Sequence, residues 1–211
     1  MKKVIVVTRV NNYRPDLCEF TIPNLRAYAS RINADFLEIE HVKYNYFHVA
    51  FEKLQAYDLI KSGKYDKALL VDADIMLYPG LPDLTENFTL QECASWMSYQ
   101  IKSPQLTLWD IDDDPCFQRD GRNLGIVGSI VGCSKYTVDI FKPDMTTHPK
   151  GLYRPEIIDE YTMSRNVAQY GLKHVGLWGH YDGVFHAEAT TKNEKDVVEK
   201  ARKLSREWSN A

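Results

Sequence analysis

The fold is decided by residues 51–84, which read FEKLQAYDLIKSGKYDKALLVDADIMLYPGLPDL. The first part carries apolar residues at helical spacing and predicts a helix that ends near Gly63. These apolar residues are Phe51, Leu54, Tyr57, Leu59 and Ile60. Residues 67–71, KALLV, are a continuous apolar run that predicts a buried strand. The strand leads directly into Asp72 and Asp74, which places both carboxylates at the sheet edge where open α/β proteins bind ligands.

The residues before this stretch also alternate between strand and helix. Residues 3–8, KVIVVT, are rich in β-branched side chains and predict a central parallel strand. After a loop over residues 9–16, Pro23 is placed in a first helical turn, and a helix of about three turns follows. The apolar positions of this helix are Leu25, Tyr28, Ala29 and Ile32. Residues 35–40 predict a second strand, so the chain is of the α/β class, with a mostly parallel central sheet flanked by helices.

The pattern is less regular beyond Pro79. The predicted elements are short strands over residues 94–98 and 124–131, a helix over 155–170, a strand over 173–177 and a loop over 178–192. An amphipathic helix ends the chain, and its apolar face consists of Val197, Val198, Ala201, Leu204 and Trp208. These elements extend the same α/β arrangement toward the C-terminus.

The composition excludes several classes of protein. The chain has 211 residues, a formal net charge of -3 and a pI near 6.1, so it fits one domain and offers no basic field to nucleic acid. Arg9 interrupts the N-terminal apolar run too early for a signal sequence or a membrane span. The four cysteines, which form no CxxC pair, fit buried thiols in a reducing compartment; they are Cys18, Cys93, Cys116 and Cys133. We therefore expect a soluble, cytoplasmic protein without a transmembrane segment.

Asp72 and Asp74 form an Asp-Ala-Asp sequence whose carboxylates can converge where the chain turns at a strand end. Oxygen ligands of this kind favour Mg²⁺ or Mn²⁺. A nucleoside diphosphate sugar needs such an ion, because the cation stabilises the negative charge that develops on the departing pyrophosphate. The alternative interpretation is that the two aspartates only cap a turn before Pro79.

The stretch 51–84 resembles the donor-binding core of glycosyltransferase family eight, the glycogenin and galactosyltransferase-like group. In that family a helix with a basic residue precedes an apolar strand, a DxD sequence and a short loop that ends in an Asp-Leu or similar pair. The resemblance implies a GT-A fold, which is Rossmann-like, in a single domain over residues 1–211. It places the donor-binding half at 1–90, the acceptor-side half at 91–192 and a C-terminal helix at 193–210.

The loop over residues 8–13 resembles the first-strand loop of that family, which contacts the uridine. Thr8 and Tyr13 hold the positions of a contacting Thr and Tyr, with Arg9 in the same loop, and the resemblance implies that Tyr13 stacks on uracil. Lys53 holds the position of the family's basic residue, which faces the donor phosphate or sugar. The alternatives are an ordinary loop aromatic for Tyr13 and a solvated helix lysine for Lys53.

Two later segments resemble the parts of the family that contact the donor sugar. Asn123 and Gly125, in RNLGIVGSIVG, resemble its Asn-x-Gly strand, and Asp159 and Glu160, in PEIIDEYTMS, resemble its Asp-Gln or Asp-Glu pair. The resemblance implies a retaining transfer in which Asp159 and Asn123 orient the sugar and no dedicated nucleophile is needed. An inverting enzyme would need a carboxylate base, for which Glu160 or an aspartate of residues 110–114 is the candidate.

His186 and Lys192, in HAEATTK, have the spacing of the family's C-terminal His and Lys, although the usual glycine and Pro-Trp are absent. Neutral imidazole is an acceptable third ligand for Mn²⁺, and an ammonium group neutralises a phosphate oxygen. We therefore assign Asp72, Asp74 and His186 as metal ligands, with Asp72 and Lys192 also contacting the donor. His180 is the alternative third ligand.

The resemblance implies transfer of a hexose from a UDP-sugar, with glucose, galactose or a deoxyhexose as the sugar, to a carbohydrate or glycoprotein acceptor. One alternative is a Mg²⁺-dependent phosphatase of the haloacid dehalogenase type, which also carries an Asp-x-Asp at a strand end, although usually on its first strand. Another is a sugar-binding module without catalysis. A nucleotidyltransferase fits less well, because TRVNNYRPD lacks its Gly-rich phosphate loop. The charged C-terminal helix is suited to docking a neighbouring domain of a longer protein.

Overall fold

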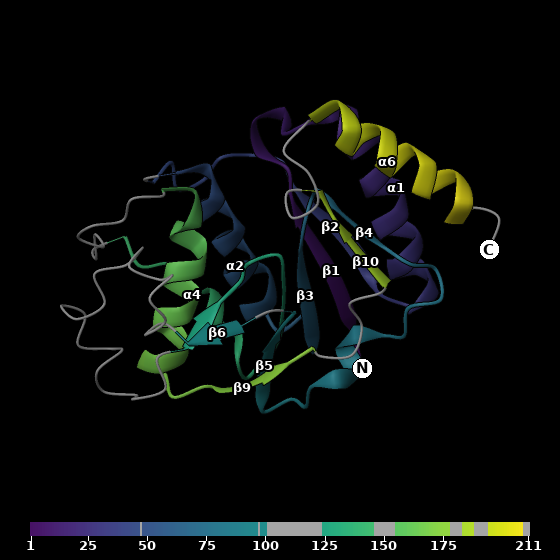
Figure 1. Ribbon diagram of the computed structural model, residues 1–211. Helices are drawn as coiled ribbons and strands as arrows, with labels where there is room; N and C mark the ends of the chain where they lie inside the picture. The colour runs from purple at the N-terminus through teal and green to yellow at the C-terminus, as the bar shows by residue number, and fades with distance from the viewer. Residues whose placement is uncertain are drawn as a thin grey trace.

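A six-stranded sheet forms the centre of the protein in the computed structural model (Figure 1). The structure describes residues 1–46, 48–96, 98–100, 124–145, 155–177, 183–187 and 194–208. In the strand order β2-β1-β3-β8-β5-β9, the strands are β1 (Lys3–Thr8), β2 (Asp35–Ile39), β3 (Lys67–Asp72), β5 (Glu92–Ser95), β8 (Ile130–Ser134) and β9 (Lys173–Gly176). β8 is antiparallel to both of its neighbours, and the other pairings are parallel. The predicted α/β class with a mostly parallel central sheet is confirmed.

Two small antiparallel sheets and several helices complete the described part of the fold. β4 (Ile75–Leu77) pairs with β10 (Val184–His186), and β6 (Ser98–Gln100) pairs with β7 (Leu124–Ile126). The α-helices are α1 (Pro15–Arg31), α2 (Ala56–Lys61), α4 (Ile158–Gln169) and α6 (Glu194–Trp208). The 3-10 helices are η1 (Val10–Asn12), η2 (Val49–Gln55), η3 (Leu84–Asn87), η6 (Val138–Phe141) and η7 (Pro155–Ile157). None of the helices in these ranges has both the length and the apolar character needed to cross a membrane.

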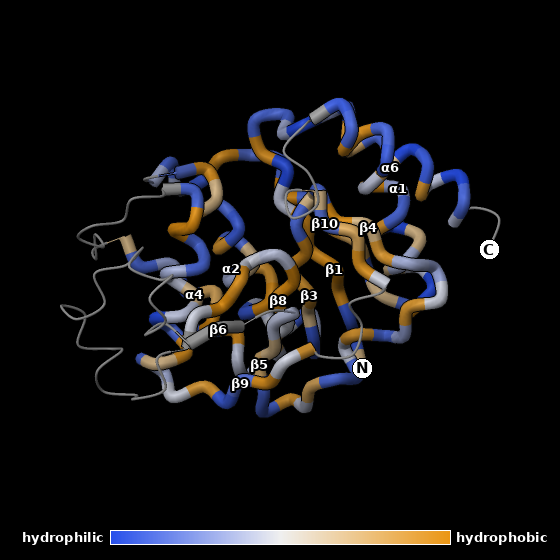
Figure 2. Tube along the Cα trace, viewed as in Figure 1, coloured by the Kyte–Doolittle hydropathy of each residue, from blue (hydrophilic) through white to orange (hydrophobic). Residues whose placement is uncertain are grey.

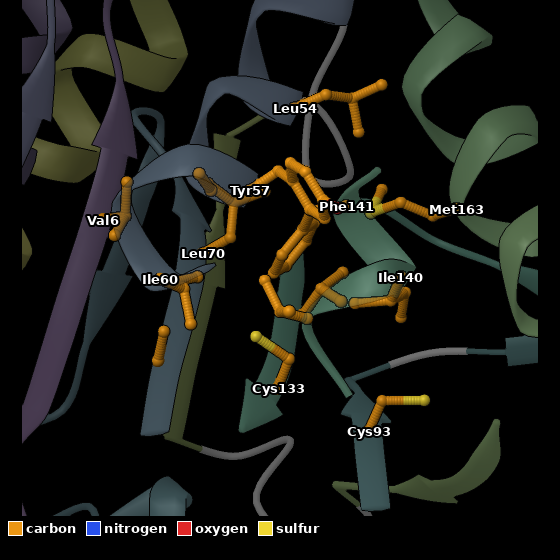
Figure 3. Packing of buried hydrophobic residues seen from close by; sticks show 14 of the residues in the cluster. Val6, Leu54, Tyr57, Ile60, Leu70, Cys93, Cys133, Ile140, Phe141 and Met163 are labelled. Carbon is orange, nitrogen blue, oxygen red and sulfur yellow. The ribbon is translucent and has the colours of Figure 1, made fainter. Parts of the chain in front are cut away.

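The central strands are buried on both faces because successive side chains of a strand point to opposite sides. Val4 and Val6 of β1 belong to one apolar cluster, and Ile5 and Val7 belong to another. Helices α2 and α4 cover the first cluster, part of which is drawn in Figure 3, and α1 covers the second. α6 packs on the outer side of α1 (Figure 1). Hydrophobic colour follows β1 and β3 through the interior in Figure 2, whereas α6 is mostly hydrophilic.

The first helix is longer than the sequence predicts. It begins at Pro15 and contains Pro23 in its interior, so the prediction that Pro23 lies in the first turn is wrong. Pro15 occupies the start of the helix, where its missing N–H costs nothing. An interior proline removes one helical hydrogen bond, but burial of a long apolar face, which includes Leu17 and Leu25, keeps the helix continuous.

Three further boundaries differ from the sequence prediction. The single strand expected over residues 124–131 is split into β7 and β8 by a turn. The loop expected over residues 178–192 contains β10 within its described part. The helix expected from Phe51 is a 3-10 helix until Gln55 and becomes α-helical from Ala56. Strands of three residues are too short to show an alternating pattern, which explains why β10 was not predicted.

Candidate active site

The two aspartates lie at the carboxyl end of β3 and in the turn that follows it. Asp72 ends β3 and is in register with Thr8 of the parallel neighbour β1. Ala73 and Asp74 form a turn before β4. The Thr21 hydroxyl of α1 donates a 2.5 Å hydrogen bond to the carbonyl oxygen of Ala73 and fixes this turn. Asp74 is held inside the protein with only 2% of its surface exposed.

The strand β10 brings a histidine to the same place. His186 is in register with Ile75 in the antiparallel pair of β10 and β4. The N–H of Ala187 donates a 3.2 Å hydrogen bond to the carbonyl oxygen of Asp74, and His186 Nε2 lies 3.6 Å from Asp74 Oδ2. One ligand atom from each of Asp72, Asp74 and His186 lies within 4.8 Å of the other two. One cation can therefore contact all three side chains.

Lys53 links this cluster to α4. Its Nζ lies 2.6 Å from Asp72 Oδ1 and 2.9 Å from Asp159 Oδ2. Asp159 is in the first turn of α4 and is 1% exposed. Burial alone lowers the pKa of Lys53, but the two carboxylates outweigh burial and raise that pKa well above its ordinary value. The alternative interpretation, a solvated helix lysine, is therefore wrong, because the ammonium group is held between two aspartates.

The cluster carries more negative than positive formal charge. Three carboxylates, of Asp72, Asp74 and Asp159, face one ammonium group, of Lys53, which leaves a formal charge of -2. Burial raises the pKa of Asp72, Lys53 lowers it, and Asp74 and Asp159 raise it further, with a net increase. Asp74 Oδ2 is buried and accepts no hydrogen bond from the described residues. These side chains fit a divalent cation, which would neutralise the excess charge.

A glycine allows the turn between β7 and β8 to reach α4. A Cβ atom on Gly128 would lie 2.6 Å from Asp159 Oδ2, so a larger residue would displace that carboxylate. The Gly128 N–H donates a 2.9 Å hydrogen bond to Glu160 Oε1. The carbonyl oxygen of Ser129 accepts a 2.9 Å hydrogen bond from the N–H of Asp72. Gly128 was not predicted as a site residue, because it is one of three glycines in RNLGIVGSIVG and no local pattern distinguishes it from the other two.

The loop after β1 brings the other predicted donor residues to the same edge of the sheet. The Thr8 hydroxyl oxygen is buried and forms no hydrogen bond with a described residue. Arg9 Nε lies 3.3 Å from Glu38 Oε2, and Arg9 Nη2 lies 2.5 Å from Glu40 Oε1. Tyr13 follows η1 and is partly buried against the apolar cluster beneath α1. Arg9 is therefore already paired with two carboxylates, that of Glu38 in β2 and that of Glu40 directly after β2.

A cavity of about 300 Å³ lies beside this loop. Its lining consists of Asn11, Val42, Asn45, Tyr46, His48, Val49 and Glu52. Asn11 has a φ of 55° and Asn45 a φ of 47°, so two asparagines of the lining adopt the left-handed backbone conformation, which is uncommon for residues other than glycine. The cavity was not predicted from the sequence, because its walls come from loops that have no periodic pattern.

Several predicted site residues lie outside the described ranges. They are Asn123, Lys192, the alternative ligand His180, and the aspartates of residues 110–114. Gly125 is described: it is buried in β7, opposite Tyr99 of β6. The N–H of the next residue, Ile126, donates a 2.8 Å hydrogen bond to Ser164 Oγ of α4. β7 is thus attached to the helix that carries Asp159.

No protein-family model and no curated protein matches the chain, but solved structures do. A glycosyltransferase involved in glycosylation of the major capsid of PBCV-1 is similar over 96% of this chain and 100% of its own, with a TM-score of 0.56 and 10% identity. A mutant Drosophila β1,4-galactosyltransferase 7, in complex with manganese, UDP-Gal and xylobiose, is similar over 94% of this chain and 79% of its own, with a TM-score of 0.53 and 14% identity. The glycosyltransferase GlyE of Streptococcus pneumoniae TIGR4 is similar over 100% of this chain and 64% of its own, with a TM-score of 0.51 and 12% identity.

These similarities confirm the predicted fold. The chain has the GT-A fold of nucleotide-sugar glycosyltransferases, with the Asp72 and Asp74 carboxylates at the carboxyl end of a central strand. The structural similarity establishes the fold alone, because the identities are only 10 to 14%, so the reaction has to be argued from the site. The narrower resemblance to glycosyltransferase family eight stays a prediction.

Proposed function

We propose that this protein is a metal-dependent glycosyltransferase that moves a hexose from a UDP-sugar to a hydroxyl group of a glycan. The observation that carries the proposal is the cluster of Asp72, Asp74 and His186, whose ligand atoms lie within 4.8 Å of one another. The cluster lies at the carboxyl end of β3, and ligands of open α/β sheets bind at this edge. The GT-A fold supports the same conclusion, because its solved examples include a complex with manganese and UDP-Gal.

Asp72, Asp74 and His186 would hold the cation. Two carboxylate oxygens and a neutral imidazole nitrogen are a suitable set of ligands for Mn²⁺ or Mg²⁺. The buried Oδ2 of Asp74, which accepts no hydrogen bond from the described residues, supports this assignment. When bound, the cation supplies positive charge beside the diphosphate leaving group. Lys192 is proposed as a second positive charge on that diphosphate.

The nucleoside of the donor is proposed to lie at the carboxyl end of β1. Thr8, Arg9 and Tyr13 emerge at this point, and the cavity of about 300 Å³ has Asn11 and Tyr46 in its lining. Amide groups and aromatic rings match the hydrogen-bonding edges and the flat face of a nucleobase. The resemblance to family eight favours uracil as the base.

The donor sugar is proposed to contact Asp159. Lys53 holds the Asp159 carboxylate at 2.9 Å, so its oxygens are fixed in position to orient sugar hydroxyls, with Asn123 in the same role. This arrangement favours a retaining transfer. In the inverting alternative Glu160 would act as general base, but Glu160 Oε1 already accepts a hydrogen bond from Gly128, which makes it a weaker base.

Calorimetric titration of UDP, UDP-glucose and UDP-galactose, with and without Mn²⁺, tests the proposal. We expect Mn²⁺-dependent binding of the uridine nucleotide and slow hydrolysis of one UDP-sugar when no acceptor is present. A sugar-binding module would bind glycans without hydrolysing a donor, and a phosphatase would hydrolyse a simple phosphomonoester. If no uridine nucleotide binds in the presence of Mn²⁺, the donor assignment is wrong.

Substitution of the aspartates tests whether they bind the cation without being needed for folding. Asp74→Asn and Asp72→Asn each replace a metal-binding carboxylate by an amide of the same shape, so we expect loss of Mn²⁺-dependent donor binding with a folded protein. Asp66→Asn is the control, because Asp66 precedes the opposite end of β3 and contacts Lys135. Undiminished turnover in the Asp74 or Asp72 variant would contradict the metal site.

A further inference from the structure

The 3-10 helix η2 contacts two parts of the proposed site at once. Lys53 contacts the carboxylates of the cation cluster, whereas its neighbour Glu52 contacts the segment that follows β2. Successive side chains of a 3-10 helix point in directions about 120° apart, so adjacent residues contact different parts of the protein. One short turn of chain therefore joins the cation cluster to the wall of the cavity.

The Glu52 carboxylate accepts hydrogen bonds from the backbone N–H groups of residues 43–45. Its Oε2 accepts a hydrogen bond from the N–H of Lys43 at 2.8 Å, and its Oε1 accepts one from the N–H of Asn45 at 2.7 Å. The N–H of Tyr44 lies 3.0 Å from Oε1 and 3.1 Å from Oε2. Glu52 is 1% exposed. A buried carboxylate with three backbone donors fixes the path of that backbone strongly.

Two other side chains of η2 reinforce this segment: Phe51 through ring contacts that do not involve Glu52, and Gln55 through Glu52 itself. The ring of Phe51 packs against Tyr44 and Tyr46, with centroids 5.6 Å and 4.7 Å apart. Gln55 Nε2 donates a 2.7 Å hydrogen bond to Glu52 Oε2 and so orients the carboxylate. The aromatic contacts are expected to keep the segment close to η2 even when Glu52 is substituted.

The surroundings of Glu52 favour its ionised form. Burial alone raises the pKa of Glu52, but hydrogen bonds from Lys43, Tyr44, Asn45 and Gln55 outweigh burial and lower that pKa below its ordinary value. Asn45 has a φ of 47°, a left-handed conformation that asparagine adopts more readily than most residues but that contacts with the surroundings still help to hold. The hydrogen bond from its N–H to Glu52 is one of the contacts that do so.

We propose that Glu52 is a positioning residue for the nucleoside of the donor, because it holds residues 43–45 in place and Asn45 of this segment is part of the cavity wall. Asn45 and Glu52 both line the cavity, and Asn11 lines it from the loop after β1. The inference rests on the proposed function, which assigns the nucleoside to this cavity. A wall that is ordered before the ligand arrives saves the entropy of ordering it during binding. Glu52 therefore acts on nucleotide affinity and not on the transfer step.

Glu52→Gln is the variant that tests this role. An amide has the same size but only one accepting oxygen, so at least one of the three N–H groups loses its acceptor. The contacts of Lys53 with Asp72 and Asp159 do not involve Glu52. We expect the Kd of UDP in the presence of Mn²⁺, and the KM for the UDP-sugar, to rise about tenfold. The kcat should change by less than about twofold, and Mn²⁺ alone should bind with unchanged affinity.

Glu92→Gln is the matched control. Glu92 is 7% exposed and accepts a 2.9 Å hydrogen bond from the N–H of Thr89, but it lies on β5, away from the cavity lining. Its substitution should leave UDP binding unchanged. Amide hydrogen exchange without ligand adds a direct readout, because the amides of residues 43–45 should exchange faster in the Glu52 variant only.

The outcomes separate this inference from the proposed function. If the wild type binds UDP with Mn²⁺ and Glu52→Gln binds it equally well, the role of Glu52 is wrong and the proposed function stands. If kcat and Mn²⁺ affinity fall together with nucleotide affinity, Glu52 has only a general structural role and the inference is also wrong. If the wild type binds no uridine nucleotide, both proposals fail. Where Glu52→Gln does not fold, Glu52→Asp, which keeps the charge on a shorter side chain, should raise the same KM and speed the same amide exchange.

Discussion

The side-chain nitrogen of Lys53 lies 2.9 Å from Oδ2 of Asp159, and this ion pair joins η2 to the first turn of α4. The same nitrogen lies 2.6 Å from Asp72 at the end of β3. Lys53 thus lies between Asp72, which belongs to the cation cluster, and Asp159, which does not. Removing one member of a buried ion pair costs far more than the pair contributes, because the other charge remains buried.

Lys53→Met is expected to lower the free energy of unfolding by about 3 kcal/mol, because the apolar stem is kept but two carboxylates lose their counter-charge. Mn²⁺ should restore part of this loss, since it binds the folded protein and neutralises the same carboxylates. Denaturant unfolding with and without Mn²⁺ measures both effects. Lys61→Met on α2 removes an exposed lysine and is the control. A Lys53 variant as stable as the wild type would contradict the importance of the ion pair.

His186→Ala is expected to weaken Mn²⁺ binding by at least about tenfold, because it removes the proposed nitrogen ligand of the cluster. Calorimetry with Mn²⁺ alone measures this effect without a donor. His174→Ala is the control: His174 lies on β9 and contacts Ser95, with 2.9 Å between His174 Nε2 and Ser95 Oγ. A larger effect of His180→Ala than of His186→Ala would assign the third ligand to His180.

Gly128→Ala is expected to reduce transfer strongly, because the added methyl group would lie 2.6 Å from Asp159 Oδ2 and push that carboxylate out of place. Gly132→Ala is a control with a similar clash, 2.6 Å from the ring of Phe88, in the apolar core. Both variants should lose about 1 to 3 kcal/mol of stability. Only Gly128→Ala should lose turnover beyond what its reduced stability explains, as measured by kcat at a temperature where both variants are folded. Equal turnover in the two would contradict the proposed role of Asp159.

Stability is expected to fall in acid partly through Glu92. Hydrogen bonds from Lys173 and Thr89 lower the pKa of Glu92 from its ordinary value of 4.5 to about 2. A carboxylate with a depressed folded-state pKa stabilises the protein above the unfolded-state pKa, and this contribution is lost as the pH falls from 4.5 to about 2. The free energy of unfolding of Glu92→Gln should therefore depend less on pH in this window than that of the wild type. Parallel pH curves would contradict this assignment.

The sequence predicted the parts of the fold that have a periodic or continuous apolar pattern. β1 and β3 are recognisable because their side chains are buried on both faces, and the aspartates follow β3 directly. The start of α1 was missed, because Pro23 is usually a breaker and only burial of the whole helix face overrides it. β10 was missed because its three residues pair with β4, a strand far away in sequence.

The candidate site was also predicted only in part. The resemblance named Asp72, Asp74 and His186, and the structure brings their ligand atoms together. Gly128 and Glu52 were missed, because their importance comes from contacts with distant segments, α4 for Gly128 and the loop after β2 for Glu52. No local sequence pattern indicates contacts between distant segments, so only the folded structure identifies these two residues.

The pairing of β10 with β4 has a consequence for the order in which the protein matures. Asp72 and Asp74 leave the ribosome long before His186, which reaches them only when β10 docks on β4. Domains fold as units during synthesis, so a nascent chain that stops before β10 would carry two of the three ligands. The full set of proposed ligands is therefore assembled only after residue 186 has been synthesised and β10 has paired with β4.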